Sequence, residues 1–249
     1  EADGQVLYTY DEEGKRLSMS DLTGTSTYQY DADGRITGIQ QGDGSVILYN
    51  YDSYGNLAKL IYPDGSEVQY EYDALDRLIK VTDREGKETG YTYDVAGNMT
   101  EVLRANQTSA KLTYDAAHQV TEIQNRDAKG KTISTYRYTY DLSGYILTES
   151  IKTKKETKVS NYGYDAAGQL SEIVMKDSED KVIQRVTYAY DGAGNKIEVR
   201  QSTENALEQA TETITKNTYN AANRLVSSEQ DGKETTYLYD ANGNRVREL

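Results

Sequence analysis

Apolar residues recur along the chain at a spacing of two over short segments, and Gly-containing turns separate these segments. The commonest such segment is Tyr-x-Tyr, as in residues 70–72 and 237–239. Residues at a spacing of two lie on the same face of a β-strand. The pattern therefore predicts short strands with two tyrosines on one face, joined by tight turns.

The second tyrosine of each pair begins a repeating unit, Tyr-Asp-x-x-Gly. The unit occurs eleven times at steps of 20 to 29 residues, once with Asn220 in place of Asp. A fixed period of this length indicates an array of similar structural units. We predict that the structural repeat motif consists of Tyr10, Asp11, Gly14, Tyr30, Asp31, Gly34, Tyr51, Asp52, Gly55, Tyr72, Asp73, Tyr93, Asp94, Gly97, Tyr114, Asp115, Tyr140, Asp141, Gly144, Tyr164, Asp165, Gly168, Tyr190, Asp191, Gly194, Tyr219, Tyr239, Asp240 and Gly243.

The position four residues after each of these tyrosines is the most informative one. It is Gly in eight repeats and Asp76, His118 or Asn223 in the others. Gly, Asn, Asp and His are the residues that best tolerate a positive φ. We therefore predict a left-handed backbone position in every repeat, as a tight hairpin turn requires.

An aliphatic residue or Met starts a return strand after each turn, and most early repeats then reach a second turn such as Pro63-Asp64-Gly65. Each repeat is thus two strands and two turns, or about 22 strands in an antiparallel meander. Residues 201–216 allow a helical turn or an extended hairpin, and their Thr content favours the hairpin. We predict an all-β fold of tandem hairpins in a continuous curved or spiralling sheet, with residues 1–249 as one domain and no separate second domain.

Composition narrows the picture further. The chain has 24 Tyr and no Phe or Trp, so tyrosine must supply nearly all aromatic surface. Its hydroxyl needs a partner or water, which favours thin layers with wet edges. The net charge of −13 argues against nucleic acid and anionic membranes as partners, and no apolar run predicts membrane insertion. The absence of Cys excludes disulfides and thiolate metal sites.

The sequence shows no constellation typical of catalysis. The one histidine, His118, stands at the turn position, and the YD aspartates recur in register, where a carboxylate accepts hydrogen bonds from turn amides. Asp31-Ala32-Asp33-Gly34 matches a calcium loop only in part, since Ile36 stands where such a loop needs Gly. We predict no catalytic residue, no cofactor and no metal site.

The unit Tyr-x-Tyr-Asp-x-x-Gly, seen at residues 237–243, resembles the YD repeats of the Rhs family. That family includes bacterial polymorphic toxins, wall-associated proteins, the B and C components of insecticidal toxin complexes, and animal teneurins. The resemblance covers essentially the whole chain. It implies a spiral of β-hairpins that forms part of a shell, and a secreted or cell-surface location. The family's self-cleaving core has no counterpart here, since Pro63 is the only proline.

We therefore expect a segment of a longer protein with a structural, non-catalytic role. Its partners would be the rest of the parent YD-repeat polypeptide and the C-terminal toxin that the shell encloses or presents. The alternative is an adhesion module whose exposed tyrosines and long late hairpins bind glycans or another protein. Free strand edges also favour an edge-to-edge dimer.

Overall fold

The computed structural model describes residues 5–204 and 210–249. Every regular element in these ranges is a β-strand. Neighbouring strands run antiparallel to each other, as β1 and β2 do. The predicted all-β hairpin fold is therefore confirmed. No helix occurs in this part of the chain, and so none is long and apolar enough to cross a membrane.

The chain divides into two compact units, Glu1–Ala110 with Ala128–Gly130, and Lys111–Asp127 with Lys131–Leu249. The strands of the first unit are β1 (Leu7–Tyr10), β2 (Arg16–Asp21), β3 (Gly24–Tyr30), β4 (Ile36–Gln40), β5 (Val46–Tyr51), β6 (Leu57–Ile61), β7 (Glu67–Tyr72), β8 (Leu78–Thr82), β9 (Glu88–Tyr93) and β10 (Met99–Leu103). The boundary falls within β11 (Ser109–Tyr114).

The strands of the second unit are β12 (Val120–Arg126), β13 (Thr132–Tyr140), β14 (Ile146–Thr153), β15 (Thr157–Tyr164), β16 (Leu170–Lys176), β17 (Val182–Tyr190), β18 (Lys196–Glu204), β19 (Ala210–Tyr219), β20 (Leu225–Gln230), β21 (Lys233–Tyr239) and β22 (Arg245–Glu248). Strands β18 and β19 pair from Glu198↔Lys216 to Glu204↔Ala210, which confirms the extended hairpin for this stretch. Residues 205–209, which were part of that expectation, lie outside the described residues.

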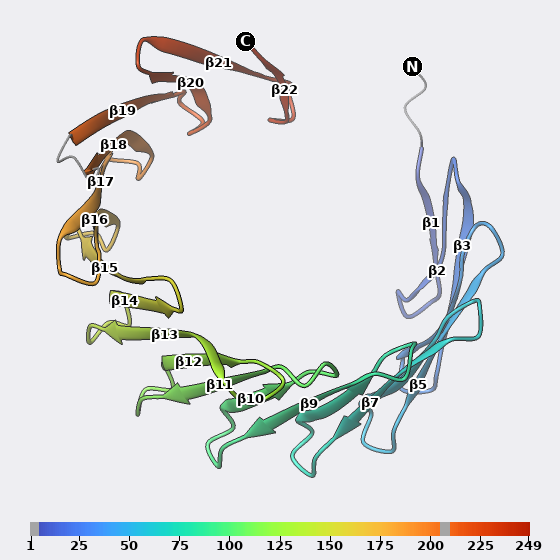
Figure 1. Cartoon of the computed structure of the whole chain (residues 1–249). Coiled ribbons are helices and arrows are strands. Elements are labelled where there is room, and N and C mark those ends of the chain that lie inside the picture. The colour runs from blue at the N-terminus through green and yellow to red at the C-terminus, as the bar shows by residue number, and fades with distance from the viewer. Residues whose placement is uncertain (1–4, 205–209) are drawn as a thin grey trace. The chain divides into compact units, whose positions relative to one another are not determined.

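Within each unit the strands lie side by side in chain order, which gives one meandering layer (Figure 1). Among the described residues no large side chain is fully buried. Such a layer has no interior, so cross-strand side-chain pairs must supply most of its stability. The expectation that residues 1–249 form a single domain remains a prediction.

A stripe of mostly tyrosine and aliphatic side chains runs across the strands. Leu60 stands opposite Tyr49 on one side and Val68 on the other. Val81 stands in the same way between Tyr70 and Thr89. Residues directly opposite one another share a face of the sheet, so these side chains define one surface, which we call the tyrosine face.

The opposite face is polar. In the first unit it carries ion pairs between neighbouring strands, such as Lys59 with Glu67 at 2.8 Å and Lys80 with Glu71 at 2.6 Å. These pairs are exposed to solvent and contribute little each. The asymmetry of the two faces follows from strict alternation along strands such as β7, with sequence EVQYEY.

Candidate functional site

The YD turns form the first candidate site, because they bring the repeated residues together. In the turn after β3, the Gly34 amide donates to the Asp31 carbonyl oxygen at 3.1 Å, and the Asp31 amide donates to the Arg35 carbonyl oxygen at 3.0 Å. Gly34 has a φ of 80°. This combination of a tight turn with a left-handed glycine closes a β-hairpin with a bulge. A shift of register between Gln29 and Tyr30 marks the bulge.

All eleven predicted turn positions have a positive φ, between 55° at Asn223 and 94° at Gly55. The prediction drawn from the spacing of glycines is thus confirmed, including at Asp76 and His118. His118 lies in the same turn geometry as the glycines, with its amide donating to the Asp115 carbonyl oxygen at 3.1 Å.

Each YD aspartate holds its own turn together. Asp31 Oδ1 accepts hydrogen bonds from the backbone amides of Asp33 at 3.0 Å and Arg35 at 2.9 Å. Asn220 Oδ1 accepts the equivalent pair from Ala222 and Arg224, both at 3.0 Å. Only the shared acceptor oxygen is needed for these bonds, which explains why Asn can replace Asp at this position.

In several turns the second carboxylate oxygen accepts a hydrogen bond from the side chain that follows the turn. Arg77 Nε lies 2.7 Å from Asp73 Oδ2, and Asn195 Nδ2 lies 2.9 Å from Asp191 Oδ2. These side-chain hydrogen bonds hold the pKa of Asp73 and the pKa of Asp191 below the ordinary value. Asp73 and Asp191 therefore stay ionised and act as fixed acceptors.

The YD tyrosines connect consecutive hairpins. The Tyr72 hydroxyl donates to the backbone carbonyl oxygen of Leu57 at 3.0 Å, and Leu57 begins the return strand of the preceding repeat. The same bond to the preceding return strand is formed by eight further YD tyrosines, namely Tyr30, Tyr51, Tyr93, Tyr140, Tyr164, Tyr190, Tyr219 and Tyr239. We call this bond the tyrosine latch.

The latch supplies a bond that the backbone ladder lacks. The first residue pair between β6 and β7 is Lys59 with Gln69, so the backbone pairing stops two residues short of Leu57. Pairing between β16 and β17 begins at Glu172↔Thr187, again two residues inside the Leu170 carbonyl that Tyr190 reaches. The phenol thus satisfies an acceptor at the edge where neighbouring hairpins separate.

A second contact couples each turn to the next one. The side chain that follows a turn glycine reaches over the glycine of the following turn. A Cβ atom built on Gly168 would lie 3.0 Å from Tyr145 Cζ, and one on Gly55 would lie 2.8 Å from Arg35 Nη1. Gly is therefore favoured at these positions by its φ, and the end of a neighbouring side chain occupies the space that it leaves.

In two of the turns without glycine, the residue at the turn position instead accepts a hydrogen bond from the Asn side chain of the preceding turn. Asn56 Nδ2 donates to Asp76 Oδ1 at 2.8 Å, and Asn195 Nδ2 donates to Asn223 Oδ1 at 3.0 Å. Asn98 precedes His118 by 20 residues, as Asn56 precedes Asp76. A short Asn thus precedes each of the three turns without Gly, whereas Lys, Arg, Gln or Tyr precedes a turn with Gly.

These repeated contacts occur in a chain whose sequence matches the teneurin YD-shell family over residues 4–82 and 65–209. The chain belongs to the YD-shell family. Its residues 219–249 match the RHS repeat family in addition. A search of curated proteins gives no match.

Solved structures support the same fold. A crystal structure of TcdB2-TccC3 without its hypervariable C-terminal region is 17% identical, with a TM-score of 0.68, and the match covers 98% of this chain and 16% of that one. The Tc holotoxin pore of Photorhabdus luminescens gives 17% identity, a TM-score of 0.62 and the same coverage. TcdB2-TccC3-Cdc42 gives 14% and 0.54, also with 98% and 16% coverage. This YD-shell chain thus spans about a sixth of the length of those chains.

The tyrosine face of the YD-shell chain is the second candidate site. Tyr91 and Val102 stand opposite each other in β9 and β10 and, with Thr89, line a groove of about 600 Å3. Lys87 and Arg104 also line this groove. The half-buried phenol ring of Tyr91 has polar neighbours, and such a ring is suited to stacking on a flat apolar surface, such as the face of a sugar ring.

Polar residues interrupt the aliphatic stripe at several positions, among them Glu149 and Glu248. Glu149 stands opposite Tyr138 in the ladder and accepts a hydrogen bond from the Tyr162 hydroxyl at 3.0 Å. Burial, followed by this bond to a carboxylate, raises the pKa of Tyr162 to about 12. Glu149 therefore acts as an acceptor for tyrosines on a face that otherwise carries mostly tyrosine and aliphatic side chains.

The described residues contain no group of three or more His, Cys, Asp or Glu side chains that could hold a metal ion. The YD aspartates are distributed one per turn, and each is engaged with its own turn amides, as at Asp94 and Asp240. These aspartates therefore stabilise the turns in which they occur.

Two regularities escaped the sequence reasoning. An aliphatic residue stands nine positions after the YD tyrosine in most repeats, as at Leu60 and Val81, and forms the stripe. The second is the match between each turn residue and the side chain that precedes it by one repeat. Aligning the repeats on the YD tyrosine would have revealed both signals.

Proposed function

We propose that this chain is a non-catalytic wall region of a secreted or surface Rhs-type protein, and that the wall encloses or presents a C-terminal effector. The observation that supports this proposal best is the recurrence of the tyrosine latch, which bonds one hairpin to the preceding one in nine repeats. Such a layer extends by addition of identical units and offers no unique reactive centre. The family match to shell repeats supports the same role.

The wall role requires further YD repeats in the parent polypeptide, since the matched structures use chains about six times longer. The coding sequence on either side of this segment should therefore carry additional YD repeats and an effector. Flanks without such repeats would contradict the proposal.

Enclosure is tested on the whole parent polypeptide by limited proteolysis. A wall-breaking substitution such as Gly168→Pro should expose the C-terminal effector to the protease, because it disrupts a turn on which Tyr145 packs. Gly65→Ala, at a turn with open space around the glycine, serves as the control and should leave the effector resistant. Equal digestion of the effector in the unaltered protein and in Gly168→Pro would contradict enclosure.

The groove at Tyr91 favours adhesion as a second function, with a glycan or a protein as ligand. A glycan array probed with the unaltered chain and with Tyr91→Ala tests the glycan form. Binding should be lost in Tyr91→Ala and kept in Tyr54→Ala, since Tyr54 is 84% exposed in a turn outside the groove. Glycan binding would be excluded if no sugar bound, or if neither substitution changed the binding.

A further inference from the structure

Two segments of the first unit match the acceptor motif for N-glycosylation, which is Asn-x-Ser/Thr with any residue except Pro in the middle. They are Asn98-Met99-Thr100 and Asn106-Gln107-Thr108. Asn98 follows the YD turn that begins at Asp94, whereas Asn106 lies at the tip of the hairpin between β10 and β11. The structure separates the two motifs, because their side-chain amides have different surroundings.

The side-chain amide of Asn98 is engaged in its own turn. Asn98 Nδ2 donates to Asp94 Oδ2 at 2.9 Å, and the Asn98 backbone amide donates to Asp94 Oδ1 at 2.9 Å. Asn98 is also half-buried. A sugar attached to this nitrogen would therefore disturb a bond that stabilises the turn.

The side-chain amide of Asn106 is held by its oxygen alone. Asn106 is exposed, and its Oδ1 accepts hydrogen bonds from the Thr108 backbone amide at 3.0 Å and from the Thr108 hydroxyl at 2.7 Å. Its Nδ2 donates to no other group in the part of the chain that the structure describes. The motif threonine thus orients this side chain and leaves the nitrogen accessible.

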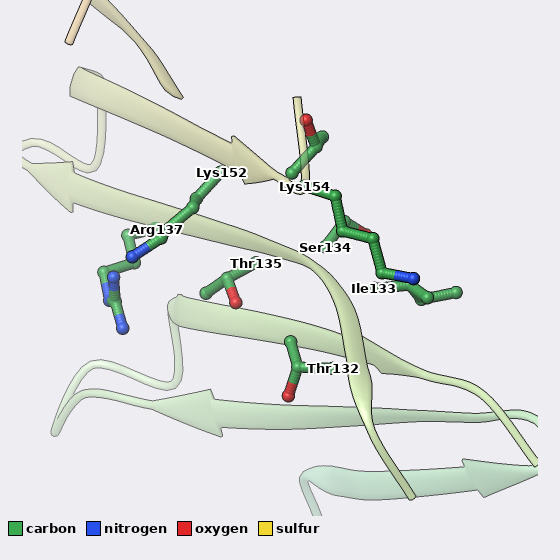
Figure 2. A pocket seen from close by; sticks show the side chains of 8 residues that line it. Thr132, Ile133, Ser134, Thr135, Arg137, Lys152 and Lys154 are labelled. Carbon is green, nitrogen blue, oxygen red and sulfur yellow. The ribbon is translucent and has the colours of Figure 1, made fainter. Parts of the chain in front are cut away.

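The same turn geometry occurs elsewhere with Asp in place of Asn. Asp64 Oδ1 accepts hydrogen bonds from the amide and the hydroxyl of Ser66, at 2.9 and 2.6 Å. A carboxylate supplies the acceptor oxygen but no N–H, so Asn106 adds a donor nitrogen to a turn that does not need one. The groove that described residues form on β13 and β14 has no asparagine among its lining side chains (Figure 2).

We propose that Asn106 is an N-glycosylation site, an inference that rests on the secreted or surface location proposed above. In this transfer Asn106 Nδ2 forms a bond to C1 of an oligosaccharide, and the bond from C1 to a lipid-linked diphosphate breaks. The diphosphate leaves with the electron pair, and a base of the transferase takes the Nδ2 proton. Asn106 lies outside β10 and β11, so the glycan disturbs no strand pair. Asn106 also lines the groove that contains Tyr91, so the attached sugar lies beside that ring.

The reaction can be tested without secretion, which separates a failure of this site from a failure of the proposed location. The purified, folded whole chain is incubated with an oligosaccharyltransferase and a lipid-diphosphate-linked oligosaccharide, and its peptides are then analysed by mass spectrometry. We expect Asn106 to be modified about tenfold more than Asn98, although both match the motif. Equal modification of the two asparagines, or none at Asn106, would overturn the proposal.

Variants separate the nitrogen from the turn. Asn106→Asp keeps the acceptor oxygen, as Asp64 does in its turn, so it should abolish modification and leave the urea midpoint unchanged. Thr108→Val removes the motif hydroxyl and should lower modification about tenfold.

Asn98→Gln is the matched control, because it removes the other motif and Gln stands at the same place of the repeat in Gln119 and Gln169. It should leave the modification of Asn106 unchanged. A loss in Asn98→Gln equal to that in Asn106→Asp, or an unchanged yield in Asn106→Asp, would overturn the proposal.

Discussion

At the scale of single residues, tyrosine is the residue on which this layer depends. A phenol ring covers apolar neighbours, while its hydroxyl reaches a backbone acceptor that the ladder leaves free, as Tyr72 does at Leu57. Phenylalanine would supply the ring alone. The absence of Phe and Trp from the chain is consistent with this double use.

Tyr72→Phe should lower the free energy of unfolding by about 1 kcal/mol, because it leaves the Leu57 carbonyl without its donor. Tyr70→Phe is the matched control, since Tyr70 lies on the same face and its hydroxyl bonds to no described residue. Urea denaturation followed by circular dichroism measures both. Equal losses for the two variants would argue against the latch.

Glycine at the turn position has two separable roles. Gly65→Ala should cost about 1 to 2 kcal/mol from its left-handed backbone alone, since the space around Gly65 is open. Gly168→Ala should cost about 1 to 3 kcal/mol more, because the new methyl group meets the Tyr145 ring. Denaturant midpoints compare the two, and similar values would show that only φ matters.

At the scale of the element, the unit is a hairpin whose turn is matched to the neighbouring turn. Much of this could be predicted from the sequence. The alternation of Tyr and polar residues indicated the strands, and the Gly, Asp, His and Asn at one position indicated the left-handed turns, as at Asp76 and Asn223.

The contacts between repeats could not be predicted in the same way. The latch joins residues about 15 or more apart, such as Tyr51 and Ile36, and depends on where the ladder ends. The pattern of polar and apolar residues does not show where the backbone pairing between two repeats ends.

The matching rule between turns predicts compensation. Gly168→Asn alone should destabilise the chain, because the introduced side chain would meet the Tyr145 ring. In a Tyr145→Asn background the same change should cost less, since it reproduces the bond from Asn195 to Asn223. A double-mutant cycle should give a coupling energy above about 0.5 kcal/mol. Additive effects would refute the rule.

Alkaline pH should weaken the second unit at Tyr162. The pKa of Tyr162 is about 12 in the folded chain against an ordinary 10.0, so the unfolded chain loses this proton first. Its stabilisation is complete below about pH 10 and is lost as the pH rises through the folded pKa. Circular dichroism with tyrosinate absorbance should show a late-titrating tyrosine, which Tyr162→Phe removes. Titration of every tyrosine near pH 10 in the folded chain would contradict this.

At the scale of the whole molecule, stability should accumulate from hairpin to hairpin. No large side chain is fully buried in the described residues, so no interior unites distant parts of either unit. Each hairpin depends on the ladder, the latch and the turn contact with its neighbour. This arrangement suits a wall that is extended by repetition, which is the role proposed for this YD-shell chain.

An experimental structure of the whole chain tests the central claim most directly, namely that repeated tyrosine contacts join consecutive hairpins into one uncovered layer. We predict phenol oxygens within about 3.2 Å of the preceding return-strand carbonyl in the repeats named above. We also predict tyrosine faces that nothing else in the chain covers. Tyrosine hydroxyls turned away from those carbonyls, or a second layer packed on the tyrosine face, would contradict the account.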